Sequence, residues 1–349
     1  MVRGAEETAA GRVGGIGPAA GRKGVTMRVF VAGAAGAIGR QLLPQLVARG
    51  HQVTAATRSP GRLARLRGLG AEPVVVDGLD ALAVGEAVAR AEPEAVIHQM
   101  TSLAGTMSLR HFDQTFAVTN RLRTEGTGHL LAAAAAAGVR RFVAQSYTGW
   151  TNVRSGAPVK SEDDPLDPDP PAEQRESLAA ISHLERAVLA APAMHPVVLR
   201  YGSFYGPGAS DDLVGLIRRR RVPIIGDGAG IWSFLHIHDA AAATVVVLER
   251  GEPGVYNVVD DEPASVAEWL PFLARAVGAR APYRVPVWLG RLAAGEVGVS
   301  MMTQIRGSSN AKARRELGWR PAWPSWRQGF AGGLTEAEPA RGAAAPGAL

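Results

Sequence analysis

Apolar residues recur along this chain in short blocks that alternate between two spacings. Runs rich in β-branched residues, typical of strands, are followed by stretches in which apolar residues recur every three or four positions, as in amphipathic helices. The predicted strands are 29–31, 51–57, 73–76, 95–98 and 141–145, and the predicted helices include one through 84–88 and one over 118–137. Strands alternating with helices predict an α/β fold, a doubly wound parallel sheet covered by helices on both faces.

The first predicted strand ends in three regularly spaced glycines. Residues 27–47 read MRVFVAGAAGAIGRQLLPQLV, with a strand before the glycines and a helix after them. Gly33 lets the chain reverse, Gly36 lets the backbone approach a pyrophosphate, and Gly39 lets the helix pack on its strand. The helix N-terminus adds free N–H groups, so this context predicts the nucleotide-binding turn of a Rossmann fold. The predicted cofactor contacts here are Gly33, Gly36, Ala37, Ile38 and Gly39.

The end of the second predicted strand carries arginine where an acidic side chain would hydrogen-bond the adenosine ribose of NAD. No Asp or Glu occurs from Gly33 to Ala71, whereas Arg58 stands at the strand end and Arg62 and Arg65 follow. We therefore predict a 2′-phosphate beside Arg58 and a preference for NADP(H) over NAD(H). The alternative is that these arginines only solvate a surface helix, which we expect of Arg65.

Ligands of doubly wound sheets bind at the carboxyl ends of the strands. After the third predicted strand, segment 77–79 offers an Asp and a Leu that can hydrogen-bond the adenine amino group and cover the ring. His98 lies inside the fourth predicted strand, and we interpret it as a packed core histidine. The predicted cofactor contacts at these strand ends are Asp77, Gly78, Leu79, Met100 and Thr101.

Composition excludes several kinds of site. The 349 residues are 46% hydrophobic, enough for a large core, and they include no cysteine, which excludes disulfides and thiolate metal sites. We predict no metal site. The net charge is only +6 and the arginines are spread along the chain, which does not indicate a nucleic-acid partner. No apolar run of about 20 residues suggests a membrane segment, so we expect a cytoplasmic protein with a small-molecule substrate.

Nine stretches occur in the order found in one known family. They are VAGAAGAIG, VVVDGLD, AVIHQM, the segment 120–127, GVRRFVAQS, VVLRYGSFYGPG, IIGDGAGIWSFLHIHDAAAA, GVYNVVDDEPAS and NAKARRELGWRP. Together they resemble the extended and atypical short-chain dehydrogenase/reductase superfamily, the NAD(P)-dependent epimerase/dehydratase group. The resemblance implies one extended unit, with 1–26 expected to be a disordered leader, 27–330 the folded unit and 331–349 a disordered tail.

The same resemblance implies roles for the second half of the chain. Residues 27–200 and 236–260 would form mainly the nucleotide-binding part, and 201–235 and 261–330 mainly the substrate-binding part. A sixth strand is expected at 196–199, and a helix at 240–249 capped by Asp239. Tyr201 and Ser203 match positions that line the nicotinamide end, while Tyr205, Trp232 and Arg306 are the candidate substrate contacts. Dimers of this family often form through two long helices, here those holding 132–137 and 178–189, so a homodimer is expected.

The catalytic positions depart from the family. Its chemistry uses a Tyr and a Lys four residues apart on one helix, because the lysine lowers the tyrosine pKa from about 10 so that the phenol can exchange a proton while hydride moves. This chain contains no Tyr-x-x-x-Lys, and alignment of RESLAAISHLERAVL puts Ser177 at the tyrosine position and Ile181 at the lysine position. Tyr147, preceded by Ser146, replaces the family's Ser or Thr at the end of strand five.

Three functions remain open from the sequence. The first is NADPH-dependent reduction of a small carbonyl or enone with a relocated proton donor, for which Tyr147, Ser146 and His183 are the catalytic candidates. The second is a nucleotide-sugar epimerase or dehydratase, and the third is a non-catalytic NADP(H)-binding regulatory protein. We favour the first, because the substrate-side motifs are retained. Tyr147 could instead pack against the cofactor, and His183 could face solvent.

Overall fold

A seven-stranded parallel sheet forms the centre of the computed structural model, which describes residues 26–102, 108–191 and 193–335. The strand order is β12-β7-β5-β4-β1-β2-β3, so the predicted doubly wound α/β fold is confirmed. The strands are β1 (Arg28–Ala32), β2 (Gln52–Thr57), β3 (Glu72–Val75), β4 (Ala95–His98), β5 (Arg141–Tyr147), β7 (His195–Tyr201) and β12 (Gly254–Val258).

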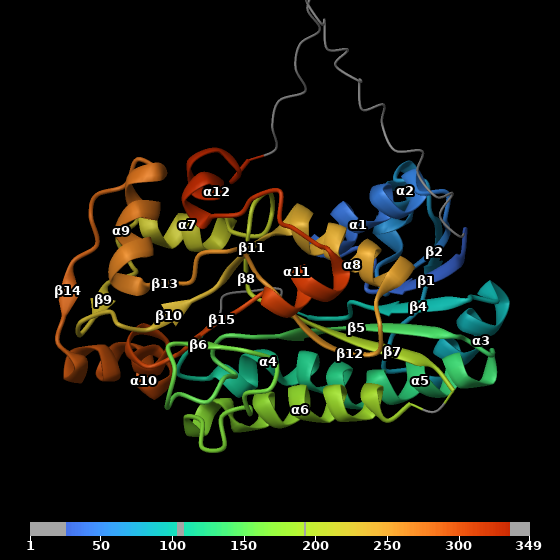
Figure 1. Cartoon of the computed structure of the whole chain (residues 1–349), viewed down its shortest axis with the longest axis horizontal. Helices are drawn as coiled ribbons and strands as arrows, with labels where there is room; N and C mark the ends of the chain where they lie inside the picture. Colours follow the sequence, from blue (N-terminus) through green and yellow to red (C-terminus); the bar gives the residue numbers. More distant parts are fainter. Residues whose placement is uncertain (1–25, 103–107, 192, 336–349) are drawn as a thin grey trace, which may run out of the picture.

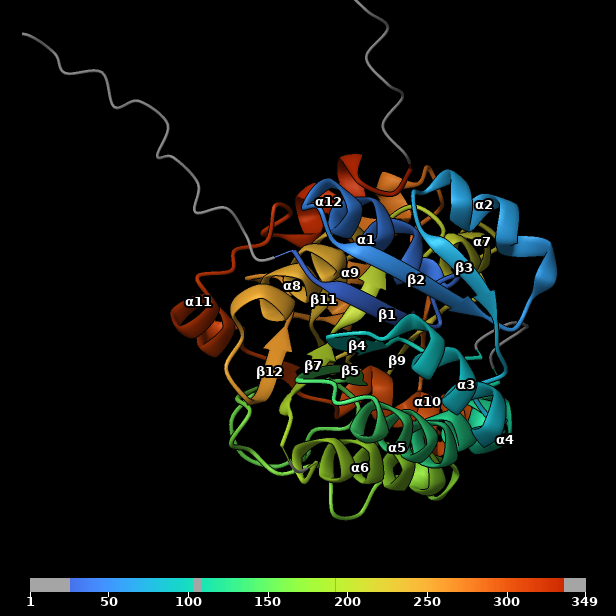
Figure 2. The same ribbon diagram turned by 90° about the vertical axis from the view of Figure 1, so that its right-hand side faces the viewer.

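Helices cover both faces of this sheet (Figures 1 and 2). One face carries α1 (Ala37–Ala48) and α8 (Ile237–Arg250), which pack against each other. The other carries α3 (Ala81–Ala91), α5 (Thr127–Ala136) and α6 (Arg175–Leu189). The short η1 (Pro60–Arg62) and α2 (Leu63–Gly68) connect β2 to β3.

The central strands are apolar on both sides because each face has its own helical layer. Side chains of β1 alternate between the two layers, as the period of two requires. Val29 and Val31 join the cluster under α1 and α8, whereas Phe30 and Ala32 join the cluster under α3, α5 and α6. Helices therefore cover both faces of the sheet, and the carboxyl ends of its strands remain for a binding site.

The smaller part lies beyond that edge and is built from the chain after β7 and after β12 (Figure 1). Its core contains the fully buried Trp269 and Trp326. The helices are α7 (Asp211–Arg218), α9 (Val266–Ala276), α10 (Val287–Thr303), α11 (Ala311–Leu317) and α12 (Trp326–Gly332). The short strands outside the main sheet pair two by two. These pairs are β8 (Ser203–Tyr205) with β11 (Phe234–His236), β9 (Ile224–Ile225) with β14 (Arg284–Val285), β10 (Ile231–Trp232) with β13 (Ala264–Ser265), and β6 (Val159–Lys160) with β15 (Gly307–Ser308).

Three sequence-based expectations need correction or limits. The helix predicted over 118–137 is two helices, α4 (Phe112–Arg121) and α5, joined by a π turn, η2 (Leu122–Gly126). Asp239 does not cap α8, because the His236 side chain accepts from the His238 N–H instead, while the Asp239 carboxylate accepts from the backbone of the 322–323 segment. Helix α12 ends at Gly332, past the predicted limit of the folded unit, and residues 1–25 and 336–349 lie outside the described residues.

The Gly39→Ala variant is expected to lose about 3 kcal/mol of unfolding free energy through overpacking. A Cβ at Gly39 would lie 1.9 Å from the backbone oxygen of Ala34, so α1 would have to move off its strand. The matched control is Gly85→Ala in α3, where a Cβ meets nothing within 4 Å, and which should gain stability from helix propensity. Urea denaturation of both variants measures the difference, and equal midpoints for Gly39→Ala and wild type would contradict this account of the turn.

Candidate functional site

The glycine turn between β1 and α1 has the shape that a dinucleotide pyrophosphate requires. Gly33 has φ +83°, and a Cβ there would lie 2.5 Å from the backbone oxygen of Gln99. Gly36 is the N-cap of α1, and no side chain bonds to this helix start, whose first turn has no acidic residue. The backbone N–H groups at this end therefore face no competing carboxylate, and the turn fits a bound phosphate.

Two arginines flank this turn from the end of β2. The Nη2 atom of Arg58 donates to Ser102 Oγ at 3.2 Å, and the Nη1 atom of Arg62 donates to the backbone oxygen of Ala35 at 3.1 Å. Within the described part of the chain neither guanidinium pairs with a carboxylate, whereas other surface arginines, such as Arg121, do. The structure thus brings two positive charges to the position expected for the adenosine ribose.

The strand ends after β3 and β4 lie against each other. A Cβ at Gly78 would lie 2.3 Å from the Met100 sulfur, so these two residues touch. The Asp77 carboxylate accepts from the Leu79 N–H at 3.0 Å, which fixes the turn. Thr101 is exposed at the same edge. Gly78 and Met100 are thus in contact, and the cofactor-binding roles of all five residues stay predictions.

Tyr147, at the end of β5, is paired with Ser203 at the start of β8. Their hydroxyl oxygens are 3.0 Å apart, and either can be the donor. Burial raises the pKa of Tyr147, and the hydrogen bond to Ser203 opposes this only in part. A phenol with a raised pKa is protonated at neutral pH, so Tyr147 suits the role of proton donor better than that of base.

Ser146 faces the opposite direction, into the layer under α6. Its Oγ donates to the Glu185 carboxylate at 2.6 Å, and the same carboxylate holds the Arg200 guanidinium through bonds of 2.8 and 2.7 Å. Ser146 and Arg200 are register partners on β5 and β7, which explains their shared direction. Because the Ser146 proton is committed to this buried carboxylate, the geometry does not support Ser146 as a catalytic group.

At the family's tyrosine and lysine positions this chain has Ser177 and Ile181. Ser177 is fully buried, donates to Asp113 Oδ1 at 2.6 Å and accepts from Asn120 Nδ2 at 3.0 Å. Ile181 lies in an apolar cluster with Phe112, Trp150, Leu178 and Met301. Asp113 also caps α6, accepting from the N–H groups of Glu176 and Ser177. Sequence reasoning missed Asp113, since nothing local marks its contact with a helix 63 residues away.

Three further predicted site residues lie in different surroundings. Tyr201, the last residue of β7, accepts from Gln99 Nε2 at 3.3 Å. His183 is exposed on α6. Tyr201 is fully buried in the core, its hydroxyl 2.6 Å from Thr244 Oγ1, and burial raises its pKa to about 12. Tyr205 packs so closely on Gly329 that a Cβ there would lie 2.1 Å from its ring. The roles expected of His183, Tyr201 and Tyr205 stay predictions, to which the structure adds the exposure of His183 and the burial of the two tyrosines.

His98 is the core histidine that the sequence indicated. Its Nε2 lies 3.0 Å from Thr127 Oγ1, and its Nδ1 accepts from the Met100 N–H at 3.2 Å. Burial lowers its pKa to about 4, with the charge of Arg123 acting in the same direction. A neutral, fully bonded imidazole holds the strand end in place.

The candidate substrate residues Trp232 and Arg306 lie on the smaller part. Trp232 donates from Nε1 to the Met301 backbone oxygen at 2.9 Å, and Arg306 donates from Nε to the Arg154 backbone oxygen at 2.8 Å. Trp232 and Tyr147 pack against the same apolar cluster that contains Ile181. The wall beside Tyr147 is therefore aromatic and aliphatic.

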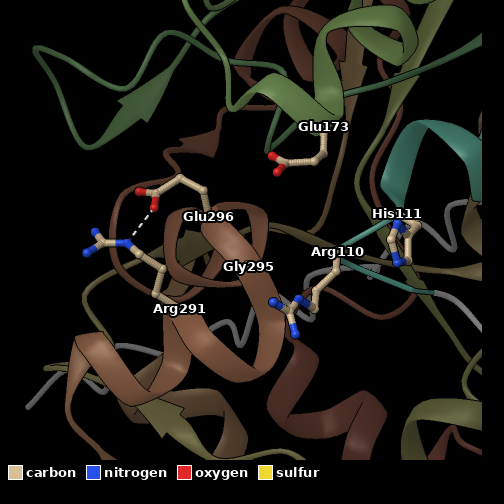
Figure 3. Close-up of a pocket in the computed structure, with 6 residues that line it drawn as sticks. All are labelled: Arg110, His111, Glu173, Arg291, Gly295 and Glu296. Atoms are coloured by element: carbon tan, nitrogen blue, oxygen red, sulfur yellow. Dashed lines mark hydrogen bonds and ion pairs between the residues drawn. The ribbon is translucent and has the colours of Figure 1, made fainter.

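A separate cavity of about 600 Å³ opens between α4, the 3₁₀ turn η3 (Ala172–Gln174) and α10 (Figure 3). Its charged lining is partly neutralised by the Arg291–Glu296 ion pair at 2.6 Å. The lining residues are Arg110, His111, Glu173, Arg291, Gly295 and Glu296. None of them was predicted from the sequence, and no motif marks them.

The described residues contain neither a membrane-spanning helix nor a metal-binding cluster. No helix among them has both the length and the apolar character needed to cross a membrane. Across the same ranges, no group of three or more His, Asp or Glu side chains is placed to hold a metal ion.

The turn, the paired strand ends and the sheet order define a Rossmann-type site for a nicotinamide dinucleotide. Comparison with known proteins agrees, since the model of the NAD dependent epimerase/dehydratase family matches residues 29–258. This chain belongs to that family, the extended short-chain dehydrogenase/reductases, and a nicotinamide dinucleotide is the cofactor that the family implies.

Named relatives span nearly the whole chain. A 3-diazoavenalumate denitrifying reductase from Streptomyces sp is 44% identical over 311 residues, covering 87% of this chain and 99% of the relative. A 4-hydroxy-2-methyl-3-oxo-4-farnesyl-3,4-dihydroquinoline-1-oxide ketoreductase from Stigmatella aurantiaca is 30% identical, covering 83% and 85%. Among solved structures, MoeE5 in complex with UDP-glucuronic acid and NAD superposes with a TM-score of 0.67 at 26% identity, covering 88% and 97%.

Proposed function

We propose that this chain is an NADPH-dependent reductase that replaces the diazonium group of a small aromatic molecule by hydrogen. The observation that carries the proposal is the combination of 44% identity to a diazo-compound reductase with the absence of the Tyr/Lys pair. In the structure the two positions hold a buried serine, bonded to Asp113, and a buried isoleucine.

The chemistry accounts for the missing pair. The glycine turn at Gly33 and Gly36 and the Arg58 guanidinium would hold the dinucleotide, which would supply a hydride. On the carbon of a diazonium group, the C–H bond would form with the hydride electron pair, and N₂ would leave with the electrons of the broken C–N bond. The reaction neither consumes nor releases a proton, so the protein needs no acid/base group. Its residues would have to bind the dinucleotide, hold the substrate and keep water out, and the apolar cluster beside Tyr147, which contains Trp150 and Ile181, supports the last two.

Reduction of a carbonyl is the second candidate, and the Tyr147–Ser203 pair favours it. A ketone needs a proton on its oxygen as hydride arrives, and the protonated Tyr147 phenol is the group placed to donate it. The ketoreductase relative supports the same class. An epimerase must first remove a hydroxyl proton, for which a phenol with a raised pKa is a poor base, so this geometry favours reduction.

The Arg58→Asp variant is expected to bind NADPH about ten to a hundred times more weakly, because a charge-assisted hydrogen bond to the 2′-phosphate is lost and repulsion replaces it. NADH binding should strengthen, since a carboxylate can accept from the ribose hydroxyl. Arg65→Asp makes the same charge change on the exposed face of α2 and is the matched control. Fluorescence titration measures both cofactors, and equal NADPH affinity in wild type and Arg58→Asp would contradict the NADP(H) preference.

The function itself is tested by NADPH oxidation against three substrate classes: arene diazonium compounds, ketones and enones, and keto-sugar nucleotides. We expect consumption with release of one N₂ per NADPH for the diazonium class. Consumption with ketones alone would transfer the assignment to the second candidate. Tight NADPH binding without consumption in any class would support the non-catalytic regulatory protein instead.

A further inference from the structure

Arg123, in the π turn between α4 and α5, is a buried cation with no carboxylate beside it among the residues that the structure describes. Its side chain is only 9% exposed, and burial lowers its pKa to about 10 with no opposing acidic group. In the described part of the chain its side-chain hydrogen bond is a long one of 3.4 Å, from Nη1 to Asn120 Oδ1. The exposed Arg121, two residues earlier, is fully paired with Glu125. A buried unpaired charge is costly, so this arrangement calls for a function.

The place of Arg123 in the fold connects it to the catalytic positions. Asn120, which accepts from Arg123, donates in turn to Ser177, the residue at the family's tyrosine position. The π turn packs directly against α6, which also carries Ile181 at the lysine position. Toward the sheet, the same segment packs on the strand ends: a Cβ at Gly126 would lie 3.2 Å from the Met100 side chain, and a Cβ at Gly78 would lie 3.2 Å from Leu122. Arg123 therefore lies between the strand edge that binds the cofactor and the helix that lacks the lysine.

We propose that the Arg123 guanidinium takes the place of the missing lysine and binds the ribose and adjoining phosphate of the nicotinamide half of the cofactor. The inference rests on the proposed function only in taking NADP(H) as that cofactor. The guanidinium offers five N–H donors, and the bond to Asn120 uses one of them. π-helical segments within helices are often found at functional sites. This one holds Arg123 against α6, the helix that has Ile181 and not a cation at the lysine position.

Stability and binding should respond to the Arg123→Met variant in opposite directions. An apolar side chain of similar length removes the buried unpaired charge, so the denaturation midpoint of the free protein should stay equal or rise. NADPH should bind about ten to a hundred times more weakly, as expected for loss of hydrogen bonds to a charged group. A purely structural arginine would give the reverse pattern, a lower midpoint with unchanged NADPH binding.

A cofactor fragment locates the contact. 2′,5′-ADP contains the adenosine half and lacks the nicotinamide riboside, so its affinity for Arg123→Met should stay within about twofold of wild type, as for independent sites. Arg58→Asp should weaken both NADPH and 2′,5′-ADP. The Arg123→Lys variant keeps the charge and should retain most of the NADPH affinity. The Arg141→Met variant removes a half-buried arginine bonded to the backbone oxygens of Val247 and Gly251, and should lower the midpoint without changing NADPH binding.

These titrations need no substrate, so they stand apart from the reductase assignment. Wild-type NADPH affinity in Arg123→Met would overturn the proposal, and so would an equal loss for 2′,5′-ADP. If wild type binds NADPH but reduces nothing, the proposed function fails while the Arg123 contact remains open to the same measurement.

Discussion

Tyr147→Phe is expected to separate the two reductase chemistries. Reduction of a ketone should fall by a factor of about 10² to 10⁴, the usual contribution of a positioned general acid, because the phenol bonded to Ser203 would no longer donate a proton. The kcat for reduction of a diazonium compound should be unchanged, since that reaction takes up no proton. The measurement is kcat for both substrate classes at saturating NADPH.

The pH dependence of ketone reduction also tests Tyr147 as the proton donor. The active form of the donor is the protonated phenol, and burial raises the Tyr147 pKa above its ordinary value. Ketone reduction should therefore stay flat through neutral pH and fall only above about pH 10, where a phenol begins to ionise. If the rate of ketone reduction falls between pH 6 and 8, a group other than Tyr147 donates the proton.

Tyr205→Phe is the matched control for these experiments. Tyr205 is also a buried tyrosine, but its hydroxyl has no hydrogen-bond partner among the described residues, and its ring packs in the core of the smaller part. Removing that hydroxyl should leave both activities as they are. Equal losses of ketone and diazonium reduction in Tyr147→Phe would show that Tyr147 has a packing role against the bound cofactor.

Glu185→Gln is expected to cost about 3 to 5 kcal/mol of unfolding free energy, because it leaves the buried Arg200 charge without its counter-ion. The Arg200 guanidinium is held by both Glu185 carboxylate oxygens, and the two side chains are 9% and 7% exposed. Chemical denaturation of wild type and variant gives this difference.

Replacing the whole network tests the cause of that loss. A variant carrying Glu185→Leu, Arg200→Met and Ser146→Ala removes the charges and the hydroxyl together, so no buried group is left unpaired. Its stability should lie much closer to wild type than that of Glu185→Gln. A loss as large as that of Glu185→Gln would show that the ion pair stabilises the sheet beyond compensating its own burial. Its NADPH binding should persist, since Ser146 has no role in the site.

Local pattern was sufficient for the architecture and for the cofactor turn. The spacing of apolar residues reflects burial on one or two faces, which is a property of each segment, and the structure has the parallel sheet it predicts. The glycine spacing is equally local, since Gly33 and Gly39 leave no room for a Cβ against neighbours on the same turn or the adjoining strand end. The absence of a Tyr/Lys pair is a fact of the sequence alone, and Ser177 and Ile181 occupy those positions in α6.

Only the tertiary structure decided which way the polar side chains point. Ser146 and Tyr147 are adjacent in sequence, yet one bonds to Glu185 under α6 and the other to Ser203 across the sheet edge. The family resemblance implies that Tyr201 lines the nicotinamide end, and the structure adds that its hydroxyl lies against Thr244 on α8 and Gln99 after β4. Arg123 carries no sequence signal, because a cation becomes notable only when packing removes water and brings no carboxylate to it. Such partners come from segments far apart in the chain, and the fold alone brings them together.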